Sequence, residues 1–113
     1  MAKPLQHQII SRALDLIRDE TNWTSIYVAR TANGSPCSCM DERAVRFCAI
    51  GALARAAQEL VGTDERIGVE RAYQAEKFVL AANNRPYETL PSINDREGHA
   101  VIVAMFKQAL LSS

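Results

Sequence analysis

The sequence lacks an excess of charge of either sign. Its 13 Lys and Arg residues are balanced by 13 Asp and Glu residues, which gives a formal net charge of zero. Because nucleic-acid binding relies on surplus positive charge facing the phosphates, this composition argues against a nucleic-acid partner. A neutral surface also produces little repulsion between copies of the chain, so we expect a homo-oligomer, most simply a homodimer.

Long hydrophobic runs are missing as well. No stretch approaches the ~18 apolar residues that a membrane-spanning helix needs, and the first residues lack the unbroken apolar segment of an export signal. We therefore expect a cytoplasmic protein that does not cross a membrane. Its three cysteines are an odd number, which favours reduced thiols over a disulfide framework in that compartment.

The residues that are present favour a folded, mostly helical chain. Hydrophobic residues make up 48% of the 113 residues, enough to build a core, and the length suits one domain spanning residues 1–113. Apolar residues recur at helical spacing from Leu5 to Glu20. The stretch from Thr24 to Thr31 is rich in β-branched and aromatic residues and precedes Asn33-Gly34, a pair that favours a tight turn, so we predict a short strand or hairpin near residues 24–40.

The Ala- and Leu-rich stretch from Asp41 to Val61 predicts a second helix, with Gly62 as its C-cap. Arg46 does not fit the polar stripe of one continuous helix over this stretch. Either a buried partner meets Arg46, or the regular helix begins after it. The second alternative places Cys48 in the first helical turn.

Two further helices complete the prediction. One begins near Thr63 and Asp64 and ends at about Ala82, before Asn83-Asn84 and Pro86. A loop from Pro91 to Glu97 then leads into a last helix from about Arg96 to Leu111, with Asn94 or Asp95 as its N-cap. The predicted fold class is mainly α (α+β): about four helices packed as a small bundle with a short β element.

Glu76 lies in the middle of the apolar arc of the third predicted helix. A buried carboxylate and a buried guanidinium each carry a large desolvation cost unless they meet. We therefore predict a buried polar pair between Arg46 and Glu76, with a structural salt bridge favoured over a functional role.

Four short sequence motifs together resemble those of a known protein family. They are Trp23-Thr24 after the first helix, Asn33-Gly34, the string Arg46-Phe47-Cys48-Ala49-Ile50-Gly51-Ala52-Leu53, and Ile93-Asn94-Asp95. This combination resembles a small bacterial and phage domain family of unknown function, and the resemblance spans most of the chain. The family implies no activity and no catalytic residues, so the resemblance supports the limits of the domain and little else.

One set of residues could perform catalysis. Cys48 in a first helical turn could act as a thiolate nucleophile, because the helix dipole favours the anion. His99 would be the base, and Asn94 or Asp95 would orient its ring. The competing interpretation, which we favour, is that Cys48 among apolar neighbours is a small buried hydrophobic residue and that Asn94 or Asp95 is a helix cap.

The chain also has enough cysteine and histidine side chains to supply the four ligands of a zinc ion. Cys37, Cys39 and Cys48 with His7 or His99 could form a tetrahedral set. However, the Cys-x-Cys spacing is too tight and a second close pair is missing, so we predict no metal site and no cofactor. The favoured function is a small binding or oligomerisation module without catalytic activity. The alternative is a thiol-dependent hydrolase or transferase that uses Cys48 with His99.

Overall fold

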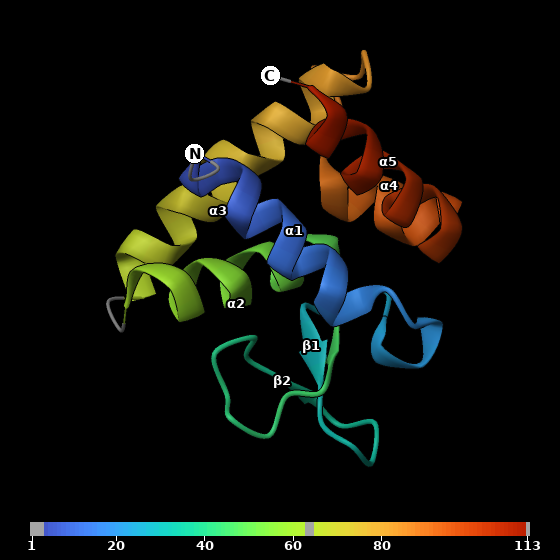
Figure 1. Ribbon diagram of the computed structural model, residues 1–113. Helices are drawn as coiled ribbons and strands as arrows, with labels where there is room; N and C mark the ends of the chain where they lie inside the picture. Colours follow the sequence, from blue (N-terminus) through green and yellow to red (C-terminus); the bar gives the residue numbers. More distant parts are fainter. Residues whose placement is uncertain (1–3, 63–64, 113) are drawn as a thin grey trace.

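The computed structural model describes residues 4–62 and 65–112 (Figure 1). Within those residues it contains five α-helices, one short 3₁₀ helix and three two-residue strands. The predicted fold class, mainly helical with a small β element, is confirmed, although we expected four helices instead of five. Thr63 and Asp64, where we placed the start of the third helix, lie outside the described residues.

Helix α1 (Leu5–Ile17) has the amphipathic face that the sequence predicts. Its buried side chains are Ile9, Ile10, Ala13, Leu14 and Ile17. The helix ends three residues earlier than predicted. The Asp19 side chain accepts the N–H of Thr21 and thereby caps the separate 3₁₀ helix η1 (Glu20–Asn22).

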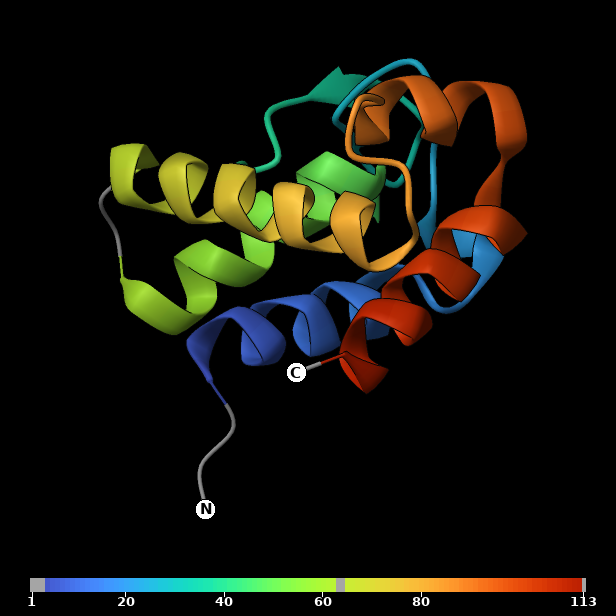
Figure 2. The ribbon, with the colours of Figure 1, turned by 90° about the horizontal axis from the view of Figure 1, so that it is seen from above.

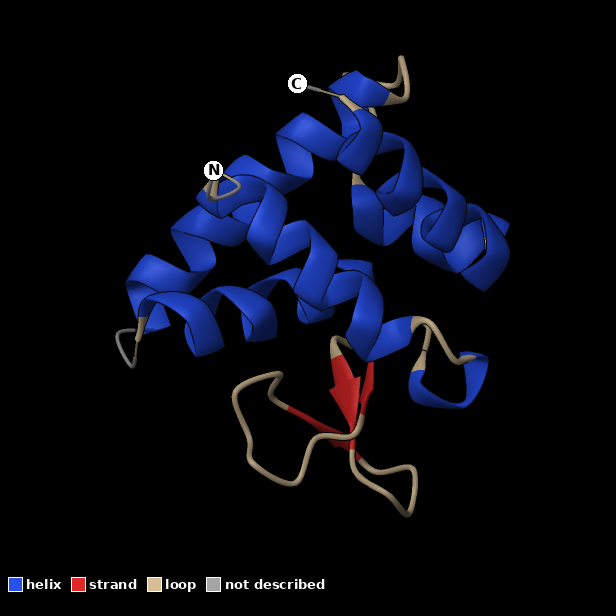
Figure 3. Ribbon diagram, viewed as in Figure 1, coloured by secondary structure: helices blue, strands red, loops and turns tan. Residues whose placement is uncertain are grey.

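A three-stranded antiparallel sheet lies at one end of the helices (Figure 3). Its middle strand β1 (Ala29–Arg30) pairs with β2 (Pro36–Cys37) on one side and with β3 (Arg46–Phe47) on the other. The predicted hairpin is therefore present, closed by the Thr31 N–H donating to the Ser35 carbonyl. We did not predict the third strand.

Helix α2 (Ala49–Val61) begins directly after Cys48, which is its N-cap residue. Of the two alternatives that the sequence left open, the one in which the regular helix begins after Arg46 is confirmed. The predicted C-cap is confirmed as well: Gly62 has a φ of 110°, and its N–H donates to the Gln58 carbonyl.

Helix α3 (Glu65–Ala82) ends where the sequence predicts. Asn84 takes a left-handed conformation with a φ of 59°, and the Arg85 N–H donates back to the Leu80 carbonyl at 2.8 Å. This hydrogen bond satisfies the Leu80 carbonyl at the end of α3, and the left-handed Asn84 turns the chain away from the helix axis.

The prediction of a loop over residues 91–97 was wrong, because helix α4 (Leu90–Glu97) occupies that stretch. Thr89 caps it by accepting the Ser92 N–H, and Pro91 lies in the first turn, where the missing N–H costs nothing. Asn94 and Asp95 consequently lie inside α4 and do not cap the last helix. Gly98, with a φ of 91°, separates α4 from α5 (His99–Leu111).

The core lies between the helices. Helix α2 packs against α1 and α3, and α5 packs against α1, α3 and α4 (Figure 2). The core includes large fully buried side chains from four helices: Phe106, Ile9, Leu53, Leu90, Ile93 and Ile102. Among the helices in the described part of the chain, none has both the length and the apolar character to cross a membrane.

Candidate functional site

The Asn94 side chain is fully buried and makes four hydrogen bonds. Its Oδ1 accepts the backbone N–H of Ala49 at 3.0 Å and the indole N–H of Trp23 at 2.8 Å. Its Nδ2 donates to the Thr24 carbonyl at 3.1 Å and to Asp95 Oδ1 at 3.1 Å. Three strings that carry the family resemblance, around residues 23, 48 and 94, thus meet at one amide group.

Asp95 holds an unusual backbone conformation in place. Its Oδ1 accepts the N–H of Ile26 at 2.8 Å. Ile26 has a φ of 75°, a region that a β-branched residue rarely enters because its Cβ crowds the backbone. The Ile26 side chain is 75% exposed, so the strain is not repaid by burial of that side chain. Strained backbone of this kind is concentrated at functional sites.

Gly51 lets the backbone of Val28, two residues after Ile26, lie directly on α2. A Cβ atom at position 51 would be only 2.1 Å from the Val28 carbonyl oxygen, which is closer than atoms can approach. The same carbonyl accepts the N–H of Cys48 at 3.1 Å. Glycine is therefore required here for the close backbone contact.

An apolar groove lies beside this contact, between α2, α3 and Val28. Its volume is about 200 Å³, and it is lined by Val28, Cys39, Ile50, Gly51, Ala54, Val69, Ala72 and Tyr73. Val69 and Tyr73 on α3 are 48% and 60% exposed, and Tyr27 beside Val28 is 47% exposed. Contiguous exposed apolar side chains of this kind mark interaction surfaces. Sequence patterns did not indicate this groove, because Val69 and Tyr73 look like ordinary core residues of the third predicted helix.

Cys48 is buried at the N-terminus of α2, with 5% of its surface exposed. Its sulfur accepts the N–H of Gly51 at 3.4 Å. Burial raises the pKa of the Cys48 thiol, and this outweighs the lowering by the backbone N–H groups of the helix end. The thiol is therefore neutral at physiological pH, which is unlike an activated nucleophile.

His99 is the first residue of α5, and its ring is engaged elsewhere. Its Nε2 donates to the Ile17 carbonyl at 2.6 Å, and its Nδ1 lies 3.9 Å from the Glu20 carboxylate. The ring also packs on Trp23 with 5.8 Å between centroids. Because the Nε2 proton is committed to a carbonyl, that nitrogen cannot accept a proton from Cys48. Asn94 and Asp95 likewise bond to Trp23, Ile26 and backbone groups, and not to His99.

The structure does not bring Arg46 and Glu76 together. Glu76 is buried in α3, and its Oε2 accepts the N–H of Leu90, the first residue of α4, at 2.8 Å. Arg46 lies on β3 and lines a separate surface cavity. The carboxylate therefore finds its partner in a backbone group at a helix start, a contact that the helical pattern could not indicate.

No group of three or more His, Cys, Asp and Glu side chains in the described ranges 4–62 and 65–112 is arranged to hold a metal ion. All three cysteines are thiols, with Cys37 and Cys39 half-buried and Cys48 buried. His7 on α1 faces the other end of the chain, where its Nε2 lies 2.6 Å from the Ser112 carbonyl.

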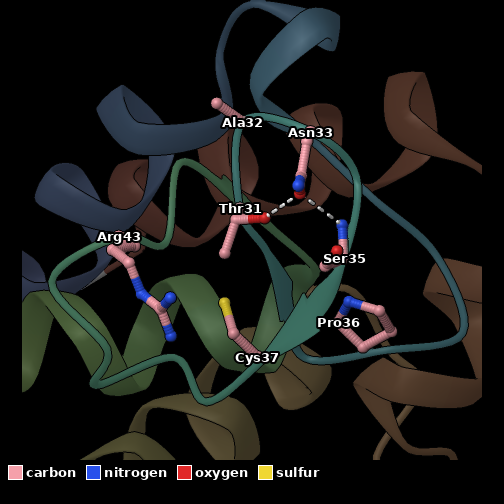
Figure 4. Close-up of a pocket in the computed structure, with 7 residues that line it drawn as sticks. All are labelled: Thr31, Ala32, Asn33, Ser35, Pro36, Cys37 and Arg43. Atoms are coloured by element: carbon pink, nitrogen blue, oxygen red, sulfur yellow. Dashed lines mark hydrogen bonds between the residues drawn. The ribbon is translucent and has the colours of Figure 1, made fainter.

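An open cavity of about 430 Å³ lies beside the turn between β1 and β2 (Figure 4). Asn33 Oδ1 accepts both the Thr31 hydroxyl at 2.5 Å and the Ser35 N–H at 3.2 Å. Arg43 pairs with Asp41 at 3.0 Å, and its guanidinium and the Cys37 thiol point into the same space. Since the Asn33 side chain and the Arg43 guanidinium are already paired within the loop, the cavity offers a ligand little recognition, and we place no site there.

Comparisons with known proteins bear on the family of the chain and not on an activity. A search of the curated proteins and a search of the solved structures gave no match. A family model matches residues 1–110, almost the full length. The chain that builds this Asn94-centred network and the apolar groove therefore belongs to a family of unknown function, DUF6197.

Proposed function

We propose that this protein is a binding module that associates with a second copy of itself through one apolar face. The face consists of the exposed segment Ile26-Tyr27-Val28, called here the 26–28 segment, and the apolar groove that begins at Val28. The observation that carries the proposal is Ile26: a strained backbone held by Asp95 presents a branched apolar side chain to solvent. A strained backbone that exposes an apolar side chain is expected where that side chain contacts a binding partner.

The groove suits a side chain better than a free ligand. Its volume of about 200 Å³ is below the ~300–1,000 Å³ that small-molecule pockets usually have. Its lining is apolar and supplies almost no polar group to orient a metabolite. An aliphatic side chain from another protein surface needs no such orientation, because apolar burial is not directional.

A second copy fits this face because the protruding residue and the groove are neighbours. Ile26 is two residues from Val28, so the two Cα atoms are at most ~7 Å apart. In a two-fold symmetric dimer each copy presents the same patch, so Ile26 of one copy can enter the groove beside Val28 of the other. The net charge of zero leaves little long-range repulsion to oppose this contact.

Sedimentation velocity over a range of protein concentrations tests the proposal. We expect the wild-type protein to form a dimer and Ile26→Asn to weaken the dimer by at least ~100-fold. Each buried aliphatic side chain contributes about 1.5–3 kcal/mol, and a symmetric dimer buries two of them. Asn tolerates a positive φ, so the variant should fold at least as stably as the wild type.

Leu111→Asn is the matched control, because Leu111 is 82% exposed and is the last residue of α5. The C-terminal end of α5 lies away from the sheet (Figure 1). This variant should dimerise like the wild type. A wild-type protein that stays monomeric at several hundred micromolar, or an Ile26→Asn variant that dimerises equally well, would refute the proposal.

A further inference from the structure

We propose that Arg30 and Arg46 form a binding site for the phosphate group of a phosphomonoester. This site does not depend on the proposed self-association. The two residues are register partners on the antiparallel strands β1 and β3, so their side chains lie on the same face of the sheet. The other register pair, Ala29 and Phe47, is buried, which places the arginines on the outer face.

Like charges directly opposite each other destabilise a strand pair. Six other arginines form ion pairs with carboxylates, namely Arg12, Arg18, Arg43, Arg55, Arg85 and Arg96. Within the described residues, neither Arg30 nor Arg46 has such a partner. An anion between the two guanidinium groups would remove the repulsion.

Arg30 is fixed in position by neutral groups. Its Nε donates to the Thr24 hydroxyl at 2.7 Å, and one terminal nitrogen donates to the Gly34 carbonyl at 2.8 Å. Its guanidinium also lies 4.8 Å from the centre of the Tyr27 ring. These contacts leave its positive charge uncompensated and hold it in one place, as a preorganised binding group requires.

Arg46 is half-buried, and in the parts of the chain that the structure describes no hydrogen bond or ion pair of its side chain is found. Both arginines line one cavity of about 370 Å³, together with Glu20, Thr21, Trp23, Thr24 and Gly34. The Glu20 carboxylate is near His99 Nδ1 and forms no ion pair with either arginine among the described residues. The donors of Arg46 are therefore available to a ligand.

A phosphomonoester is the ligand class that this site fits. At neutral pH the group carries close to two negative charges, which match two guanidinium groups, and its oxygens fit the fork of Arg donors. The cavity volume falls in the range of small-molecule sites, and Trp23 supplies an apolar wall for the group esterified to the phosphate.

Isothermal titration calorimetry at constant ionic strength tests the site by measuring the affinities for inorganic phosphate, phenyl phosphate and acetate. We expect saturable binding of phosphate, phenyl phosphate bound at least as tightly, and acetate bound more weakly. Arg46→Gln should weaken phosphate binding by ~10- to 100-fold, because hydrogen bonds to a charged group are lost. In chloride its melting temperature should equal or exceed that of the wild type, since the like-charge pair is gone.

Arg71→Gln is the matched control, because Arg71 is exposed on α3 and lines no part of this cavity. It removes the same charge and should leave phosphate binding unchanged. Equal binding by wild type and Arg46→Gln, equal loss in Arg71→Gln, or no saturable binding by the wild type would overturn the site. Binding of acetate as tight as phosphate, or failure of phenyl phosphate to bind, would overturn the ligand class.

Discussion

The side chain of Asn94 caps a helix to which it does not belong. Its Oδ1 accepts the N–H of Ala49, the first residue of α2, at 3.0 Å, although 45 positions separate the two residues in the chain. The first N–H groups of a helix have no partner within the helix, so they need an acceptor from elsewhere. Asn94 supplies one and also binds Trp23, and this joins α4 to the start of α2.

Replacing Asn94 with Ala should lower the free energy of unfolding by about 3 kcal/mol or more. The change leaves the Ala49 N–H, the Trp23 indole N–H and the Thr24 carbonyl without this partner in a buried place. Chemical denaturation measures the loss. Asn22→Ala, at an exposed position, is the control and should change stability by no more than ~0.5 kcal/mol. An unchanged midpoint for Asn94→Ala would contradict the structural role of the amide.

Asn94→Asp should be destabilising in a pH-dependent way. The new carboxyl would be buried beside Asp95, and both burial and the like charge raise its pKa. A raised pKa means that the charged form is disfavoured in the folded state, so the deficit relative to wild type should grow as pH rises. Melting temperatures of both proteins between pH 5 and pH 8 test this, and a constant difference would argue against it.

Gly51→Ala should destabilise the fold by about 3 kcal/mol or more. The added methyl group would meet the Val28 carbonyl at 2.1 Å, and backbone atoms cannot move aside as a flexible side chain can. Gly68→Ala on α3 is the matched control, since its Cβ would meet only ordinary contacts at 3.7 Å or more. That change should stabilise the protein by up to ~1 kcal/mol, because Ala favours a helix interior. Thermal unfolding compares the two, and similar effects would refute the close contact.

Cys48 should react slowly with iodoacetamide in the native protein at neutral pH. It is buried and its pKa is raised, so little thiolate is present or accessible. The double variant Cys37→Ser, Cys39→Ser isolates this thiol, and mass spectrometry follows its alkylation with and without denaturant. Rapid alkylation of the folded protein would revive the thiol-enzyme hypothesis with His99.

Substitutions at Cys48 should also reveal its role as an N-cap. Cys48→Ser keeps an acceptor for the Gly51 N–H and should be tolerated, because Ser is among the preferred N-cap residues. Cys48→Ala removes the acceptor and should be about 1 kcal/mol less stable than the Ser variant. Denaturant midpoints compare the two directly, and equal stability would rule out a capping role.

Arg85 should stabilise the connection between α3 and α4 only above acidic pH. It pairs with Glu88 at 2.5 Å and with Glu97, and it lowers the pKa of Glu88 to about 2. The unfolded pKa of Glu is ~4.3, so this contribution is complete above that value and is lost as pH falls toward about 2. The melting-temperature difference between wild type and Arg85→Gln should therefore shrink below pH ~4. For Arg71→Gln we expect no such trend.

Local signals determined the parts of the fold that short-range physics controls. The apolar face of α1, the glycine that ends α2, the left-handed turn after α3 and the hairpin near Asn33-Gly34 each follow from interactions within a few residues. The periodicity of apolar side chains and the conformational freedom of Gly and Asn act locally, so they do not depend on how the rest of the chain packs. For this reason the sequence alone predicts a mainly helical protein with a small β element.

Only the tertiary structure decided the site. Pro91 looks like part of a loop until Thr89 is seen to cap a helix that begins beside it. Asn94 carries the local pattern of a helix cap, but it caps α2 from a distance of 45 residues. Ile26 gives no sequence signal for a positive φ, because its own preference opposes that conformation and Asp95 on α4 imposes it from a distant part of the chain. Contacts between distant segments outweigh local preference at these positions, since buried N–H groups must find acceptors wherever the packed chain provides them.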